Sequence, residues 1–541
     1  MKKLSVALAI AVASVGAARA ADLPTTKGPA AAPPVNCYAS MWSWLDSTAA
    51  DCPLSYGPFT VYGTLDGGLG WESHGAGYNA AWNNGVSNIV TKQSGPHSQW
   101  LWTPNGLSQS VVGVKMSVPL PSLSSSPFLS GWSIVGDWET GFNPFYGYLA
   151  DAQRAQVQNN GKALVQQNAN ADSSRTGQWD NSQAFIGVSN PTYGTLTAGR
   201  VYTLSLDAIN SYDPMGGSYA FSPIGYSGSY AGFGDTEAAR VNTAVKYRLN
   251  YSNYRVAGLI QWGGYDQGNG TNAYYQGQLG GDFHLFGGTP WAGTLSLDGI
   301  GSWAKDAVNM GTFNGSCSVL TTGPFKGQVG CTDGVPRFYG ATDVTATLSN
   351  NTGLLLVGKY KWRALTLYGG YAWLRQTNPS DDYLNGFTTI GGWNVPATIP
   401  STLPNAKKFW PTAWTNYTNY NVPRIAPFFW VGAKYAITPQ LDVTGAFYWL
   451  QQTDYAGAAA ACVPTTTTYT QPNGSKFNFT AISNGKCAGQ TDFISALIDY
   501  RPVKRVDLYA GIMVSNVYGG LASGYQVAQT VNPTAGIRIK F

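Results

Sequence analysis

The chain has 541 residues, of which 66 are Gly, 33 Tyr, 21 Phe and 19 Trp, while only 11% are charged. Soluble globular proteins have about a quarter charged residues, and disordered chains combine high charge with few aromatic residues. This composition therefore excludes a disordered chain. Beyond the first twenty residues no run of about 18 uncharged apolar residues occurs, which also excludes a helical membrane protein.

The N-terminus has the three parts of an export signal. Lys2 and Lys3 precede an apolar stretch from residue 4 to 16, and Ala18-Arg19-Ala20 supplies small residues for cleavage. We predict a signal peptide over residues 1–20. Its removal would lower the formal net charge from +5 to +2, since two lysines and one arginine leave with it. The mature chain then lacks the basic surface that nucleic-acid binding requires.

Many aromatics, much glycine and few charges favour an all-β transmembrane antiparallel barrel, which places apolar residues at alternate positions. From Phe59 to Trp71 the odd positions are apolar or Gly, and most even positions are polar. Similar alternation predicts about sixteen strands, near 59–72, 107–118, 130–140, 181–190, 194–201, 239–250, 254–264, 275–286, 291–304, 351–361, 364–376, 425–437, 440–452, 491–501, 505–516 and 532–541. A barrel of this size leaves an aqueous channel.

The connections alternate between short and long. Tight turns are predicted at 190–194, 286–288 and 438–439, whereas 305–350, 377–424 and 453–490 are long polar stretches. Outer-membrane barrels have short turns on the periplasmic side and long loops outside. The pattern therefore predicts an exported barrel in the outer membrane.

Six cysteines follow the signal peptide and form three pairs that are close in sequence. None has the C-x-x-C spacing of a zinc site, and only three histidines are present, so no metal is expected. An exported chain reaches an oxidising compartment, where disulfides form. We predict three loop-closing disulfides, Cys37 with Cys52, Cys317 with Cys331 and Cys462 with Cys487.

Several segments together resemble the Gram-negative general porins, of the alphaproteobacterial type. They are Val61-Tyr62-Gly63-Thr64-Leu65-Asp66, Gly199-Arg200-Val201-Tyr202, Asp213-Pro214-Met215-Gly216-Gly217, Ala239-Arg240-Val241-Asn242 and Gly536-Ile537-Arg538-Ile539-Lys540-Phe541. The resemblance implies homotrimers of sixteen-stranded barrels in outer-membrane lipid and lipopolysaccharide. It also implies a third external loop, residues 202–238, that folds inward and narrows the pore.

The resemblance divides the chain into a signal peptide, an N-terminal periplasmic extension (21–57) and the porin barrel (58–541). It implies opposed charges at the constriction, acidic on the loop and basic on the wall. Carried over by position, the acids are Asp207, Asp213, Asp235 and Glu237, and the bases are Arg200, Arg240, Lys246 and Arg248. The terminal Phe541 resembles the signal that the barrel-assembly machinery reads.

The expected function is a water-filled channel for passive diffusion of small hydrophilic solutes and ions, with no cofactor. A channel specific for sugars or carboxylates is an alternative, because loop aromatics such as Tyr212, Tyr219 and Phe221 could stack against sugar rings. A structural or adhesive barrel is a more remote one. No G-x-S-x-G or H-E-x-x-H motif is present, and an enzyme is not expected.

Overall fold

The computed structural model describes the following residues: 37–73, 98–122, 126–142, 144–145, 182–224, 240–262, 273–309, 318–319, 329–330, 347–378, 387–391, 393–396, 420, 422–455, 462–470, 476–482, 487–520 and 529–541. Two α-helices are described, α1 (Met41–Leu45) and α3 (Leu204–Tyr212). The strands that pair into one large sheet are β1 (Leu54–Tyr56), β2 (Phe59–Glu72), β3 (Gln99–Pro104), β4 (Ser110–Pro119), β5 (Ser133–Phe142), β6 (Gln183–Asn190), β7 (Gly194–Tyr202), β8 (Arg240–Tyr251), β9 (Tyr254–Trp262), β10 (Ala273–Leu285), β11 (Gly293–Asn309), β14 (Thr347–Trp362), β15 (Leu365–Thr377), β18 (Arg424–Thr438), β19 (Leu441–Gln452), β22 (Gly489–Val503), β23 (Val506–Gly519) and β24 (Gln529–Lys540).

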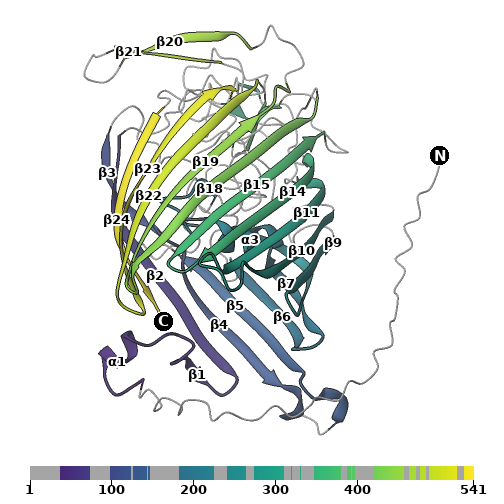
Figure 1. Ribbon diagram of the computed structural model, residues 1–541. Coiled ribbons are helices and arrows are strands. Elements are labelled where there is room, and N and C mark those ends of the chain that lie inside the picture. The colour runs from purple at the N-terminus through teal and green to yellow at the C-terminus, as the bar shows by residue number, and fades with distance from the viewer. Residues whose placement is uncertain are drawn as a thin grey trace, which may run out of the picture.

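The large sheet closes on itself into an antiparallel barrel (Figure 1). Each long strand pairs with the next in chain order, and β24 returns to β2 through the Thr64 and Lys540 pair. Within the described residues the closed ring has sixteen strands, because β1 and β3 pair only with the two ends of β2. The predicted fold and all sixteen predicted strand positions are confirmed, with shifts of a few residues at the edges.

Shorter elements lie outside this ring. Two 3-10 turns, Leu120–Ser122 and Pro127–Leu129, connect β4 to β5. Three two-stranded sheets pair β12 (Ser318–Val319) with β13 (Val329–Gly330), β16 (Phe387–Gly391) with β17 (Trp393–Pro396), and β20 (Pro464–Thr470) with β21 (Lys476–Ile482). In the described part of the chain no helix has the length and apolar character needed to cross a bilayer.

The strands form because their alternation satisfies two different environments. On β10, Gln276 and Gln278 point inward and are buried, while Leu279 points outward and is 69% exposed. Other outward positions are also large and apolar, including Leu65, Leu69, Leu297, Leu354, Leu356, Ile494 and Ile498. Exposed aromatics form two bands near the strand ends, with Tyr193, Tyr251, Tyr254, Phe286 and Trp291 at one end and Trp100, Trp102, Trp262 and Trp303 at the other.

The short connections share one end of the barrel, and the predicted tight turns lie there. At the turn between β6 and β7, the Asn190 side chain accepts hydrogen bonds from the backbone N–H groups of Thr192 and Tyr193 at 2.9 and 3.2 Å. Gly194 follows with a φ of +85°, a left-handed conformation that glycine adopts without a steric penalty. This local chemistry explains why the turn could be read from the sequence.

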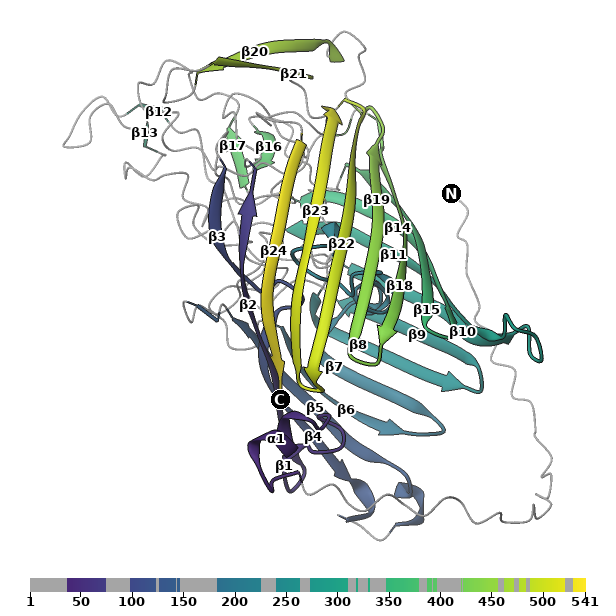
Figure 2. The same ribbon diagram turned by 60° about the vertical axis from the view of Figure 1, so that its left-hand side comes forward.

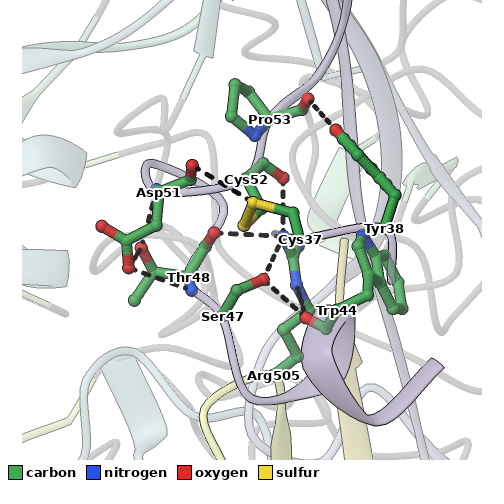
Figure 3. The surroundings of a disulfide bond; sticks show 9 residues. All are labelled: Cys37, Tyr38, Trp44, Ser47, Thr48, Asp51, Cys52, Pro53 and Arg505. Carbon is green, nitrogen blue, oxygen red and sulfur yellow. Dashed lines mark hydrogen bonds between the residues drawn. A yellow bond between two sulfur atoms is a disulfide. The ribbon is translucent and has the colours of Figure 1, made fainter. Parts of the chain in front are cut away.

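An N-terminal disulfide clasp, residues 37–56, is attached to the same end of the barrel (Figure 2). The Cys37–Cys52 disulfide closes it, and β1 pairs with the first residues of β2. The fully buried Arg505, in the turn between β22 and β23, enters the clasp (Figure 3). Its guanidinium donates to the carbonyls of Trp44, Thr48 and Cys52 at 2.9, 3.0 and 2.8 Å and lies 4.4 Å above the Trp44 ring.

The clasp contains its own small network of hydrogen bonds. The Thr48 hydroxyl and backbone N–H donate to the carboxylate of Asp51 and hold its pKa below the ordinary value. The second predicted disulfide, Cys462–Cys487, is also present, and the Cys487 carbonyl accepts from Gln452 of β19 at 2.7 Å. Cys317 and Cys331 lie outside the described residues.

Candidate pore and constriction

The inward face of the barrel is polar and carries many paired charges. Most of the paired acids and bases lie in the half of the barrel nearer the short turns. Asp442 contacts Lys434 and Arg501 at 3.2 and 2.8 Å. Asp507 contacts Arg538 and Lys540 at 2.8 and 2.9 Å. Since the opposite face of the same strands is apolar, these charges surround the barrel interior.

A break between β3 and β4 brings backbone into the interior. The buried Asp66 carboxylate accepts the N–H groups of Leu107 and Ser108 at 2.7 and 2.8 Å, and the Tyr509 hydroxyl at 2.7 Å. These bonds hold the chain around Gly106 away from the line of the strand. A Cβ at Gly106 would lie 2.2 Å from the Tyr509 Oη, so the position needs glycine.

Helix α3 follows β7 directly and begins with a side-chain cap. The Thr203 hydroxyl accepts the N–H of Leu206 at 3.2 Å, and the N–H of Leu204 donates to Gln276 of β10 at 2.6 Å. Asp207 lies in the first turn, where the helix dipole favours a negative charge. Its carboxylate forms ion pairs with both Lys246 and Arg248 of β8. The start of the helix is therefore attached to β8 and β10, which both pair with β9.

The end of α3 bonds to strands further around the ring. The Tyr212 hydroxyl donates to Asp298 of β11, and its carbonyl accepts from the indole N–H of Trp430 of β18 at 3.1 Å. The buried Asp213 carboxylate accepts from the Tyr448 hydroxyl of β19 at 2.5 Å and from the Gly217 N–H at 2.8 Å. Burial raises the pKa of the Asp213 carboxyl above its ordinary value.

The chain then continues to β23, on the opposite side of the ring from β9. The Ser218 hydroxyl and the Ala220 N–H both donate to the Gly106 carbonyl, at 2.7 and 2.9 Å. Phe221 is fully buried and meets the Tyr509 ring of β23 edge-on, with ring centres 6.2 Å apart. Strands β9 to β11 lie opposite β23 and β24 in the ring. The described residues 203–224 therefore contact strands on both sides of the ring, and both views draw α3 among these strands (Figures 1 and 2).

The structure brings together one of the predicted acids and two of the predicted bases, Asp207 with Lys246 and Arg248. Asp213 is buried, and its carboxylate accepts a hydrogen bond from the Tyr448 hydroxyl of β19. Arg200 and Arg240 are also buried rather than lining open space. The Arg240 guanidinium lies 4.9 Å above the Tyr202 ring and donates to Gln109 at 3.1 Å. Asp235 and Glu237 lie outside the described residues.

Other charged residues line a cavity of about 450 Å³ between α3 and the strands β8 to β14. Arg255 contacts Asp282 and Asp298, at 2.5 and 3.1 Å, and the Lys359 ammonium donates to the Ser211 carbonyl at 3.2 Å. The sequence prediction did not include these residues. Their signal was present, since each lies at an inward position of an alternating strand and is charged.

Two buried carboxylates, Asp137 and Glu139, lie side by side on the interior face of β5. The Tyr62 hydroxyl is 2.7 Å from Asp137 and 2.9 Å from Glu139, both on β5. Glu139 also accepts from Ser182 and Tyr202.

At the end of the barrel away from the short turns, Asp454 lies close to Cys462 and Cys487. These two cysteines form a disulfide, so this group offers a metal ion no thiolate.

No family model and no curated protein matches the sequence. Among solved structures, the anion-selective porin from Comamonas acidovorans is similar over 89% of this chain and 99% of its own, with 12% identity and a TM-score of 0.49. Salmonella typhi OmpF, in complex with daunomycin, is similar over 89% and 97%, with 12% identity and a TM-score of 0.44. Pseudomonas putida OprB is similar over 89% and 94%, with 9% identity and a TM-score of 0.44. The fold assignment here rests on the strand pairing of this chain itself.

Proposed function

We propose that this protein is an outer-membrane porin through which small hydrophilic solutes and ions diffuse passively. The closed sixteen-stranded ring is the observation that carries the proposal, because a barrel of this size is too wide for its own side chains to fill. The apolar outward face with two aromatic bands fits lipid and its interfaces. The charged inward face fits water.

Residues 202–238 are proposed as the constriction loop of this channel. The contacts of the described part, up to residue 224, with β8 to β11, β18, β19 and β23 support an inward position. Asp207, Arg248, Asp282, Arg255 and Lys359 are proposed to line the narrow part, since they surround the cavity beside α3. Buried groups such as Asp213 would hold the loop in place.

The same proposal assigns the remaining parts of the chain. Residues 1–20 would be the export signal, 21–57 the periplasmic extension that contains the clasp, and 58–541 the barrel. The barrel would lie in outer-membrane lipid and lipopolysaccharide, after insertion by the assembly machinery, and would form a homotrimer. The short turns and the clasp would then face the periplasm, because outer-membrane barrels place their short turns there.

A sugar-specific channel is less well supported than general diffusion. Tyr212 and Phe221 were candidates for a stacking surface, but both side chains are buried in contacts with the wall. A buried ring cannot offer a face to a passing sugar. Tyr212 and Phe221 therefore hold the loop to the barrel, whereas Tyr219 is half-buried and its hydroxyl donates to Gln109 at 3.4 Å.

Planar-bilayer recording of the purified full chain tests the function. A diffusion channel is expected to show conductance that rises with salt concentration, without saturable block by sugars or carboxylates. Deleting residues 214–217 is expected to raise the conductance, because the lumen next to Gly432, which Pro214 approaches, would be vacated. Saturable block by one solute would favour a specific channel, and very low conductance would favour a structural barrel.

A further inference from the structure

The acids and bases of the barrel interior lie at different depths in the wall. In the pairs of β18, β19, β23 and β24, each base is more exposed than its acid. Side-chain exposure is 1% for Asp507 against 39% for Lys540, and 7% for Asp442 against 36% for Lys434. Each of these pairs is therefore a dipole whose positive end points toward the lumen.

The same arrangement holds in β9 and β11. The Asp298 side chain is 3% exposed, while that of its partner Arg255 is 26% exposed. Asp282 is the reverse case, since its carboxylate is more exposed than Arg255. It is, however, close to two bases, because it pairs with Arg255 and lines the same cavity as Lys359.

Other interior acids are buried and accept hydrogen bonds from neutral donors. The Tyr509 hydroxyl donates to Asp66, and the Tyr62 hydroxyl lies within hydrogen-bond distance of Asp137 and Glu139. Tyr448 donates to Asp213. Burial disfavours the charged form of a carboxyl group and removes it from the surface that a solute meets. Because they are buried, these acids contribute little to the negative field in the lumen.

The acid of α3 does not reverse this balance. Asp207 forms ion pairs with two bases, so the group of three is net positive. Arg248 is the more exposed of the two, at 43% of its side chain. It lines the cavity beside α3 and a second cavity of about 440 Å³ against β4 to β8. A base therefore faces both open parts of this region.

Resting on the channel function above, we propose that the described part of the lumen selects small anions. Its described bases form a track on β14, β18, β22 and β24, made of Lys359, Lys361, Lys434, Arg501, Arg538 and Lys540, with Arg248 across the lumen. Asp282, with a side chain that is 47% exposed, is an acid in the same lumen. Charged side chains lining a pore set its ion preference, and arginine and lysine favour anions. Chloride and small carboxylates fit this chemistry.

Reversal potentials of the full chain in a KCl gradient test the proposal. The triple variant Lys361→Gln, Lys434→Gln and Lys540→Gln removes three lumen charges. Arg501 still pairs with Asp442 in this variant, and Arg538 still pairs with Asp507. One unit charge at about one Debye length from the ion path changes the anion-to-cation ratio roughly twofold. The triple variant is therefore expected to lower the ratio about eightfold.

Lys504→Gln is the matched control, because Lys504 lies in the turn after β22 and its side chain is exposed outside the barrel interior. It is expected to leave the ratio within about twofold of the wild type. A wild-type channel that prefers cations or shows no preference would overturn the proposal while leaving the channel function intact. An equal drop in the triple variant and the control would also overturn it. A chain that inserts but does not conduct would overturn both the channel function and this selectivity.

Discussion

Replacing Tyr448 with Phe removes one hydrogen bond that holds the segment 203–224 to β19 and changes little else. The Tyr448 hydroxyl donates to the buried Asp213 carboxylate at 2.5 Å, and both side chains are almost fully buried. Asp213 keeps the Gly217 N–H at 2.8 Å, so the carboxylate is not left without a donor. The loss of one such bond is expected to cost about 1–2 kcal/mol. This corresponds to a roughly 5- to 30-fold rise in the population of the released segment.

Two measurements report on that release. Single-channel records of Tyr448→Phe are expected to show more frequent transitions between conductance levels, and chymotrypsin is expected to cleave near Tyr219 and Phe221 at a higher rate. Tyr500→Phe is the matched control, because Tyr500 lies on β22 and its side chain is exposed on the outward face. If Tyr448→Phe and the control behave alike in both assays, the bond to Asp213 does not fasten the segment.

Three further predictions concern other parts of the molecule. Asp207→Asn frees Lys246 and Arg248 from their shared acid. It is expected to raise the anion-to-cation permeability ratio about twofold, which corresponds to roughly 0.4 kcal/mol. An unchanged reversal potential would show that Asp207 lies away from the ion path. Arg505→Ala removes three hydrogen bonds to clasp carbonyls, and it is expected to speed hydrogen exchange of residues 37–56 at least tenfold, with the barrel strands and a Lys504→Ala control unchanged. Deleting Phe541 is expected to reduce membrane-inserted protein, measured by fractionation, because Phe541 and Gly63 exchange two backbone hydrogen bonds at 2.9 Å where the barrel closes; a normal yield would contradict this.

The strands could be predicted because their signal is local. A strand in a transmembrane barrel has lipid on one face and water on the other, so apolar and polar residues alternate along about ten adjacent positions. Gln276, Gln278 and Leu279 show it on β10 without reference to any other strand. The turn at Asn190 is local as well, since its side chain bonds to residues two and three positions later.

Features that depend on distant partners could not be predicted in this way. The first strand was expected to be followed by one strand near 107–118, but the structure has β3 and β4 with a break between them. Asp66 causes the break by accepting the N–H groups of Leu107 and Ser108, about forty residues away. The hydrogen-bond partner of Asp213 could not be predicted either, because Tyr448 is 235 residues away in the sequence.

The residues that carry a charge and the residues that present one to the lumen are therefore different sets. Alternation identifies which side chains point inward, and this is sufficient to place acids and bases on the same interior face. It does not give depth, because depth depends on which neighbour a side chain bonds to. Long arginine and lysine side chains can bury their apolar stems and keep their charged ends in water, whereas an aspartate on the same wall stays close to the backbone. In this barrel that difference in length leaves Asp442 and Asp507 behind Lys434 and Lys540, so a nearly balanced composition produces a positive surface.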